Sequence, residues 1–515
     1  MSDATTRARP AAHSPLRHAP VVLPVVLVLA LGLGLRLWRL PAQSLSMDEV
    51  FELDLASQPA GSILVSHDGF PPLFHIVAHC WLRVAEDPAS LRVLSVVLGM
   101  LTIAAIWQLG RLAGGERCGS ISACLLAISP IHVWFSQEAR AYAPYFLLAV
   151  SAMWLFYRAR ATDRNRDWVP YLAVAVLGAY THYYMALLIL TLLLTVAFEA
   201  RPPGSLRRLG RVHVALGALC LPLLFLVQGD LGLQQSIDPV RPPINFVALG
   251  YAGFTFLGGF TLGPSLRELH SIRPVEAVRQ ALPWILLIGG AALYLIYLAL
   301  LDRSRRIWVL RFGLLVLVPL GASGLLGSWF GVGFRVRYIA WCAAPLVALL
   351  ALGAAHRTNR WPTWLALGSL AAAAMVALVN RHVLTRHMNE DMRGTARYLA
   401  SVTTPTTPIF VAAAYVEPAL QFYLRSQGDV RNVRPLSRAE WAGDSTPPMA
   451  QIRAAAGPNR AFWLIYARAF DGDPQGFLLD SLEAEAGLSR RAVLAGVEIY
   501  EGLGWGLATR ESPPR

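Results

Sequence analysis

Lysine is absent from this sequence of 515 residues, in which all 45 basic residues are arginine. The guanidinium of arginine is a planar fork and the ammonium of lysine a point charge, so any phosphate contact must use guanidinium groups. Arginine in place of lysine is also typical of a GC-rich bacterial genome. Cysteine is scarce as well. The five cysteines lie in or beside apolar runs without the spacing of metal ligands, so they predict neither a disulfide nor a metal centre.

Charged residues make up only 15% of the chain, whereas hydrophobic residues make up 55% and the mean hydropathy is +0.47. These values exclude an ordinary soluble globular protein, whose apolar share is about 45–50%. The net charge of +13 would suit a nucleic-acid partner, but the arginines occur in short clusters between apolar runs and not as a stripe on a soluble domain. The sequence therefore predicts an integral membrane protein and no binding of nucleic acid.

The first apolar run, Val21–Trp38, follows an arginine-containing tail, residues 1–20. It lacks an A-x-A cleavage pattern and is close to the roughly 20 residues that cross the hydrocarbon, so we expect a retained transmembrane helix. Later apolar runs raise the expected number of spans to about eleven. They are Leu91–Leu109, Gly119–Phe135, Tyr145–Tyr157, Pro170–Tyr180, Met185–Phe198, Val212–Val227, Leu282–Leu301, Val309–Leu326, Tyr338–Ala355 and Trp364–Val379.

The arginine clusters predict the orientation, because cytoplasmic loops collect them. With the N-terminus inside, every dense cluster falls on one side, namely Arg111–Arg117, Arg158–Arg166, Arg201–Arg211, Asp302–Arg306 and His356–Arg360. The outer side then receives the long loop, residues 39–92, and the segments Ser136–Tyr142, Thr181–Tyr184, Gly229–Gln280 and Gly333–Tyr338. We expect a transmembrane domain over residues 21–386, preceded by a cytoplasmic tail over residues 1–20.

The composition changes after the last apolar run, where acidic residues, proline and threonine return. The sequence thus predicts a polytopic α-helical membrane protein with a small C-terminal α/β domain over residues 387–515. An odd number of spans places this domain in the periplasm, outside a bacterial inner membrane. Its predicted elements are a strand, turn and helix in Ile409–Ser426, strands at Ala461–Phe470 and Ala492–Tyr500, and a helix at Gly476–Gly487.

Several charged residues on the predicted outer side are not explained by the positive-inside rule. They occur in the long loop, in Ser136–Tyr142 and just before Tyr338. These residues are Asp48, Glu49, His67, Asp68, Arg92, Glu138, Arg140, Arg335 and Arg337.

Their order and spacing resemble the membrane glycosyltransferases of the GT-C class, specifically the bacterial relatives of the protein O-mannosyltransferases and of the lipid A aminoarabinose transferase. The matching features are an acidic DE pair in the first outer loop, an acid shortly before PPLFH, the arginine of ASLRVLS, SQEARAY, RVRYIAWCAAP and EDMRGTARYLA. The resemblance implies transfer of a sugar from a polyprenyl-phosphate carrier to an acceptor hydroxyl at the outer surface, usually with inversion. Acceptors among the relatives include protein, lipid A core and cell-envelope polysaccharide, so a glycan, lipid or protein acceptor is expected.

The resemblance implies that Asp48 is the general base, because a hydroxyl is a poor nucleophile until a carboxylate takes its proton. Glu49 is expected to support local structure or to bind the acceptor. Asp68 is expected to be a second catalytic acid, held in place by the rigid Pro71 and Pro72, although the relatives place their acid nearer to the prolines. The alternatives are an N-cap for Asp48 and a solvated Asp-Gly turn for Asp68.

The leaving group would be a lipid phosphate, whose oxygens arginine can bind in pairs. Arg335 and Arg337 are expected to bind it, with Arg92 and Arg140 as further candidates for the phosphate or for pairing with acids. The alternative for these arginines is snorkelling to lipid headgroups. The remaining pocket residues are expected to be His67, Glu138, Tyr142 and Tyr338. 

We interpret His182 as part of an interfacial aromatic belt and not as a metal ligand, because it lacks co-ligands. No metal site is predicted, and a divalent ion that accompanies the lipid phosphate stays open. 

Two other classes of protein share some of these features. A transporter or flippase of lipid-linked sugars would also need arginines and carboxylates, but it would place ionisable residues near the middle of broken helices and not in outer loops. A membrane anchor that only presents the α/β domain would give the acidic residues of the outer loops no function.

Overall fold

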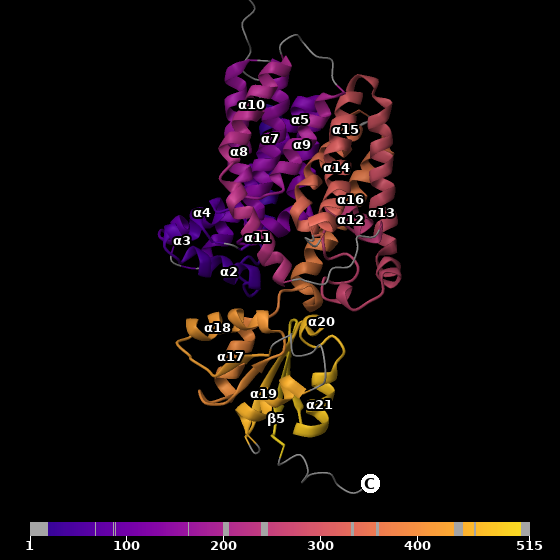
Figure 1. The fold of residues 1–515 in the computed structure, drawn as a ribbon. Helices are drawn as coiled ribbons and strands as arrows, with labels where there is room; N and C mark the ends of the chain where they lie inside the picture. Colours follow the sequence, from indigo (N-terminus) through magenta and orange to yellow (C-terminus); the bar gives the residue numbers. More distant parts are fainter. Residues whose placement is uncertain are drawn as a thin grey trace, which may run out of the picture.

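The computed structural model describes residues 19–66, 68–85, 87, 89–162, 164–198, 205–237, 246–330, 334–356, 360–436, 446–457 and 460–505. His67, a predicted pocket residue, lies outside the described residues. Figure 1 shows two parts, a tall bundle of helices and a smaller α/β unit formed by C-terminal residues at one end of the bundle.

The bundle is formed by the apolar runs of the sequence, because a backbone in hydrocarbon must satisfy its hydrogen bonds within its own helix. Among the described residues, five helices are long and apolar enough to cross a membrane, or six if α10 and α11, bent by 58°, form one span. The prediction of a multi-pass membrane protein is confirmed, and the number of eleven spans stays a prediction. The helices of the bundle are α1 (Ala19–Leu37), α5 (Ser90–Ala127), α6 (Pro130–Ser136), α7 (Tyr142–Thr162), α8 (Asn165–Ala179), α9 (Met185–Val196), α10 (Ser205–Cys220), α11 (Leu223–Ile237), α12 (Phe246–Gly258), α13 (Pro274–Leu301), α14 (Arg306–Phe330), α15 (Ala343–His356) and α16 (Trp361–Val383).

Helix α5 is two helices joined by a sharp turn at Gly115, whose φ is 80°. Gly110 and Ser122 are twelve positions apart, which in a straight helix would be about 18 Å. A Cβ added to Gly110 would nevertheless lie 2.6 Å from Oγ of Ser122. The two predicted spans Leu91–Leu109 and Gly119–Phe135 therefore begin as an antiparallel pair within this element.

The long loop, residues 39–92, is largely helical and lies at the end of the bundle that faces the α/β unit (Figure 1). It contains α2 (Met47–Ala56), α3 (Ala60–Leu64) and α4 (Leu73–Leu82). Helix α4 begins directly after Pro72, and its first amide, N of Leu73, donates to the carbonyl of Tyr180 at 3.0 Å. This contact ties the loop to the segment between α8 and α9.

The α/β unit has a five-stranded sheet in the order β2-β1-β3-β5-β4. Strand β1 pairs in parallel with β2 and β3, whereas β5 pairs antiparallel with β3 and β4. Its elements are α17 (Met392–Val402), β1 (Ile409–Val411), α18 (Glu417–Ser426), β2 (Val433–Pro435), α19 (Thr446–Ala456), β3 (Phe462–Ala467), α20 (Ala469–Gly472), α21 (Phe477–Ala486), β4 (Ser489–Leu494) and β5 (Val497–Gly502).

One predicted strand of this unit is wrong. The segment Ala492–Tyr500 is not a single strand, because it turns back at Gly496 to form the hairpin of β4 and β5. Gly496 has a φ of 66°, a left-handed conformation that glycine adopts without steric cost. The apolar residues on both sides of this glycine hid the turn from sequence reasoning.

The α/β unit contacts the long loop directly. The backbone N of Leu45 donates to the hydroxyl of Tyr423 at 2.6 Å. Oγ of Ser44 donates to Oδ1 of Asp391 at 2.8 Å, and Nδ2 of Asn389 donates to the carbonyl of Ser44 at 3.1 Å. These bonds hold the segment just before α2 against the α/β unit.

Candidate active site

The start of α2 positions the acidic pair of the long loop. Ser46 is the N-cap, and its Oγ accepts a hydrogen bond from N of Glu49 at 3.3 Å. Oε2 of Glu49 in turn accepts from N of Ser46 at 2.8 Å, which completes a capping box. Asp48 is the second residue of the helix. The alternative in which Asp48 caps α2 is therefore wrong.

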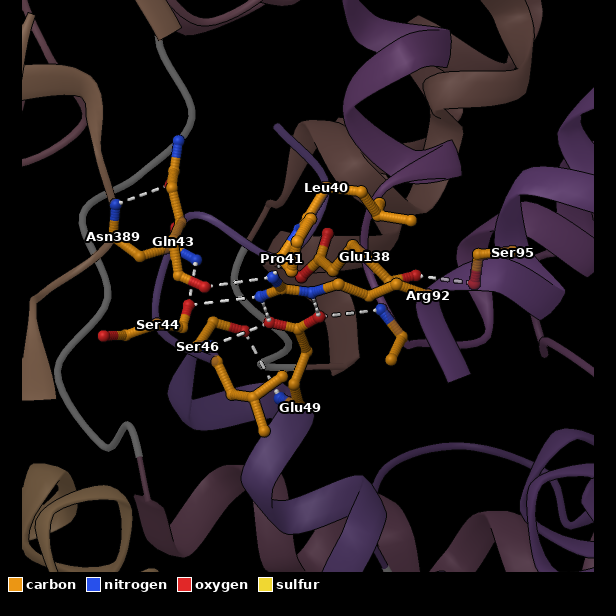
Figure 2. Close-up of polar contacts among 12 residues, drawn as sticks. Leu40, Pro41, Gln43, Ser44, Ser46, Glu49, Arg92, Ser95, Glu138 and Asn389 are labelled. Atoms are coloured by element: carbon orange, nitrogen blue, oxygen red, sulfur yellow. Dashed lines mark hydrogen bonds and ion pairs between the residues drawn. The ribbon is translucent and has the colours of Figure 1, made fainter. Parts of the chain in front are cut away.

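Glu49 is also bound by Arg92, which comes from the first turn of α5 (Figure 2). Nε and Nη2 of Arg92 donate to the two carboxylate oxygens of Glu49, each at 2.7 Å. The backbone N of Ala139 donates to Oε1 of Glu49 at 3.0 Å. The other three N–H groups of Arg92 donate to backbone carbonyls at 2.9–3.1 Å, those of Leu40, Gln43 and Ser44.

All five N–H groups of Arg92 thus have acceptors within the protein, and only 3% of the residue is exposed. A guanidinium has five donors, so none is left for a lipid phosphate. The predicted phosphate contact of Arg92 does not agree with this geometry. Arg92 and Glu49 instead fix the backbone that leads into α2, and with it the position of Asp48.

Asp48 contacts Arg337, a residue 289 positions away in the sequence. Nη1 of Arg337 donates to Oδ2 of Asp48 at 2.6 Å. Burial acts to raise the pKa of Asp48, but the charges of Arg337 and Arg140 outweigh it and hold that pKa well below its usual range. The Asp48 side chain is 38% exposed and that of Arg337 27% exposed, so a substrate can reach both.

Aromatic rings surround this ion pair. The guanidinium carbon of Arg337 lies 5.8 Å from the ring centres of both Tyr142 and Tyr338, within cation–π range. His182 lies behind them, stacked on Tyr145 with ring centres 4.3 Å apart. Only 3% of His182 is exposed, so its interpretation as part of an interfacial belt is wrong. Nε of Arg337 has no hydrogen-bond partner among the described residues.

Asp68 belongs to a second charged cluster, next to the first. Nδ1 of His75 lies 2.8 Å from Oε1 of Glu52, and Nε2 lies 3.2 Å from Oδ1 of Asp68. Nη1 of Arg140 lies 3.1 Å from Glu52 and 3.5 Å from Asp68. Burial lowers the pKa of His75, but the two carboxylates outweigh it and raise that pKa to about 9. The cluster is therefore two anions held by two cations. The alternative predicted for Asp68 is correct in its turn, because N of Phe70 donates to Oδ1 of Asp68 at 3.0 Å and Gly69 has a φ of 89°. It is wrong in its solvation, because the carboxylate contacts His75 and Arg140.

The carboxylates and the imidazole of this cluster have the chemistry of a divalent metal site. Glu52, Asp68 and His75 offer ligand atoms that all lie within 4.8 Å of one another. The carboxylates, however, lie at opposite nitrogens of one imidazole ring, and one imidazole gives only one nitrogen to one ion. Arg140 contacts both carboxylates as well. The arrangement fits an ion-pair network and does not fit a metal ion.

Glu138 and Arg335 are the remaining predicted residues of the site. Glu138 has no side-chain hydrogen bond or ion pair among the described residues; its backbone carbonyl accepts from Oγ of Ser95 at 2.7 Å (Figure 2). Burial and the charges of Glu49 and Asp48 raise the pKa of Glu138 to about 7. Arg335 is exposed, two residues before Arg337.

Sequence reasoning missed the groups that support this site. Glu52 and His75 complete the Asp68 cluster, and His75 is the last residue of the PPLFH motif. Asp230 of α11 is 2% exposed; it accepts from N of Gly69 at 3.1 Å and from the hydroxyl of Tyr183. A buried acid in an apolar segment is costly and marks a function by default, so this signal was available.

The α/β unit also contributes charge. Arg468 follows β3 with a φ of 49°, a left-handed conformation that is rare outside glycine. It donates to Glu390 at 2.9 Å and is among the cations that lower the pKa of Asp48.

Comparison with known proteins agrees with this architecture. Residues 70–227 match the family described as dolichyl-phosphate-mannose-protein mannosyltransferase. No curated protein matches the chain. The oligosaccharyltransferase of Archaeoglobus fulgidus, in a complex with Zn and sulfate, shares 11% identity at a TM-score of 0.54, covering 93% of this chain and 72% of its own. ArnT from Cupriavidus metallidurans in the apo state shares 16% identity at a TM-score of 0.49, covering 96% and 100%.

The fold is similar to that of the solved oligosaccharyltransferase of Archaeoglobus fulgidus. The segment from residue 70 to residue 227 is similar to the dolichyl-phosphate-mannose-protein mannosyltransferases. The resemblance that the sequence motifs predict is therefore confirmed.

Proposed function

We propose that this protein is a glycosyltransferase that moves a sugar from a polyprenyl-phosphate donor to a hydroxyl of an acceptor. The reaction would take place at the outer face of the bacterial inner membrane, with the α/β unit in the periplasm. The observation that carries the proposal is the contact between Asp48 and Arg337 at 2.6 Å. It brings a carboxylate and a guanidinium together at the end of the bundle, partly open to substrate.

The two groups suit the two halves of the reaction. Asp48 takes the proton of the acceptor hydroxyl as its oxygen bonds to the anomeric carbon of the sugar. The bond between that carbon and the phosphate oxygen breaks, and the phosphate leaves with the electron pair. Arg337 stabilises the charge that develops on the phosphate. Attack from the side opposite to the phosphate inverts the anomeric centre.

The ion pair has a consequence for the order of binding. A carboxylate bound to a guanidinium is a weak base, because the pair holds its pKa low. A donor phosphate that competes for Arg337 would release Asp48 and strengthen it as a base. Asp48 is thus expected to act once the donor is bound.

Two features support a lipid-phosphate donor. The description of the matched family names dolichyl-phosphate mannose. The archaeal oligosaccharyltransferase AglB from Archaeoglobus fulgidus, a solved structure with a TM-score of 0.51 and 11% identity, is a complex with a dolichol-phosphate and an inhibitory peptide. Arg335 and Arg140 are the further arginines proposed near the phosphate, and Asp68, Tyr142 and Tyr338 are proposed to line the donor pocket.

The test is a transfer assay in proteoliposomes, with radiolabelled polyprenyl-phosphate sugars and a membrane extract as the source of glycan, lipid and protein acceptors. We expect label to reach an acceptor with the wild type and not with Asp48→Asn, which keeps the shape of the side chain and removes the base. Asp54→Asn is the matched control, because Asp54 is an exposed acid of the same helix.

Transfer by Asp48→Asn at the wild-type rate would remove Asp48 from the mechanism. Movement of label across the bilayer by both proteins, without transfer, would instead identify a flippase.

A further inference from the structure

A polar pocket lies on the other side of the pair of Glu49 and Arg92, between the ends of α1, α6 and α16. The pocket is open to solvent, and about 380 Å³ of empty space is counted when this open mouth is included. Glu49 and Arg92 form one wall, and Glu138 borders the same space in Figure 2. The complete lining is Arg39, Leu40, Gln43, Ser46, Glu49, Arg92, Trp134, Gln137, Glu138, Arg381, His382 and Asn389.

Several buried polar atoms that line this pocket have no hydrogen-bond partner among the described residues. Arg381 is 7% exposed, and its Nε and Nη1 have no partner in the described part of the chain. Gln137 is 4% exposed; its Nε2 donates to three backbone carbonyls at the end of α1, and its Oε1 accepts from no described residue. Neither ring nitrogen of His382 has a partner within the described ranges. Buried polar groups are almost always satisfied, so these atoms indicate a missing ligand or ordered water.

The charges of the lining favour an anion. Glu49 and Arg92 neutralise each other at 2.7 Å. Arg39 and Arg381 then remain as two cations beside one acid, Glu138. The acid and the oxygen of Gln137 can accept hydrogen bonds, so the ligand should also carry donors.

The backbone at the mouth is strained. Arg39 has a φ of 54°, and the described residues include only one other non-glycine residue with a positive φ. Such strain costs about 1–3 kcal/mol, and residues of this kind cluster at active sites and ligand-binding sites. It holds an exposed guanidinium at the edge of the pocket.

The pocket also lies at the ends of apolar helices, where lipid headgroups are expected. Helices α1 and α16 are apolar, and α16 is long enough to cross a membrane. Trp38 and His382 meet edge to face at their ends, with ring centres 4.7 Å apart, and Arg381 lies 3.9 Å above the ring of Trp134. Tryptophan and arginine at the ends of spans mark the membrane interface.

We propose that this pocket binds the headgroup of an anionic lipid that carries a phosphate ester next to free hydroxyls. The phosphate would accept hydrogen bonds from Arg39 and Arg381, and the hydroxyls would donate to Gln137 and Glu138. The site is separate from the ion pair of Asp48 and Arg337, and it does not depend on glycosyl transfer.

The test uses the full chain purified in detergent and measures the midpoint of thermal unfolding during titration with phosphatidylglycerol, phosphatidylcholine or inorganic phosphate. Phosphatidylglycerol has the phosphate and the hydroxyls, phosphatidylcholine lacks the hydroxyls and the net charge, and inorganic phosphate lacks the lipid. We expect phosphatidylglycerol alone to stabilise the wild type. Arg381→Gln should weaken its apparent affinity about tenfold or more, the effect of losing a charge-assisted contact.

Arg386→Gln is the matched control, because Arg386 is an exposed arginine near the same helix end and outside the pocket lining. Arg39→Gln serves as the second variant if Arg381→Gln does not fold, since Arg39 is exposed. Equal weakening by Arg386→Gln would show non-specific attraction and overturn the proposal. Equal stabilisation by phosphatidylcholine would also overturn it, and equal stabilisation by inorganic phosphate would assign the pocket to a free anion.

Discussion

Replacing Arg92 by methionine separates the two roles that this residue could have. In the structure its five N–H groups bind Glu49 and three backbone carbonyls, and the residue is 3% exposed. Arg92→Met keeps a long apolar stem and removes every donor. If Arg92 positions α2, the variant loses stability and catalytic rate together. If Arg92 binds the donor phosphate, it loses donor affinity alone.

The magnitude follows from the burial of the pair. Removing one partner of a buried, hydrogen-bonded ion pair costs about 3–5 kcal/mol, because the other charge stays buried without compensation. Glu49 would keep two backbone donors, from Ser46 and Ala139, which places the cost toward the lower end. The entropy of unfolding is about 2.1 cal/mol/K per residue, so for 515 residues 1 kcal/mol shifts the midpoint by about 1 °C. The midpoint of thermal unfolding should therefore fall by roughly 3 °C.

The assay is thermal unfolding of the detergent-purified protein, followed by intrinsic fluorescence, beside donor kinetics in proteoliposomes. The double variant Glu49→Gln with Arg92→Met should regain part of the loss, because it no longer buries an unpaired charge. Arg111→Met is the control: Arg111 is also in α5, but it pairs with Glu116 at the surface, where such pairs contribute about 0–1 kcal/mol. An unchanged midpoint with a raised KM for the donor would refute the positioning role.

Three further predictions follow from the charged clusters. Arg337→Gln should raise the KM for the lipid donor more than the KM for the acceptor. The measurement is steady-state kinetics in which each substrate is varied in turn, and an equal rise of both KM values would contradict the prediction. The pKa of His75 is raised from 6.5 to about 9. The contribution of protonated His75 to stability is therefore complete below about pH 6.5 and is lost as the pH rises toward 9. The unfolding midpoint of the wild type should fall across this pH range, and the midpoint of His75→Gln should fall less. Removal of divalent ions with EDTA should leave the unfolding midpoint unchanged, because Arg140 and His75 already balance Glu52 and Asp68; a lower midpoint that Mg²⁺, Mn²⁺ or Zn²⁺ restores would show a metal site there.

Local patterns in the sequence were sufficient for several features. The apolar runs predicted the helices of the bundle, because 18 to 25 apolar residues have few other stable structures. The DE pair, PPLFH and SQEARAY identified the segments of the site, and their order identified the GT-C class. In the α/β unit, the pattern from Ile409 to Ser426 predicted a strand, a turn and a helix, which are β1, a short 3₁₀ turn and α18.

Partners across the fold were not readable from these patterns. Nothing near Asp48 in the sequence indicates that Arg337, 289 residues away, binds it. Nothing near Arg92 indicates that its donors are used by Glu49 and three carbonyls. The sequence predicted that both arginines bind the phosphate of the donor. Their hydrogen-bond partners in the structure show that the two side chains have different roles.

The sequence by itself determined that this chain enters a membrane, which segments carry the charge, and which class of protein they resemble. These properties depend on composition and on spacing along the chain. Only the tertiary structure decided which charges meet: Asp48 with Arg337, Glu49 with Arg92, and Asp68 with His75 and Arg140. An ionisable side chain takes its role from the charges and hydrogen-bonding groups that surround it in space, and in this protein the packing of distant helices supplies those groups.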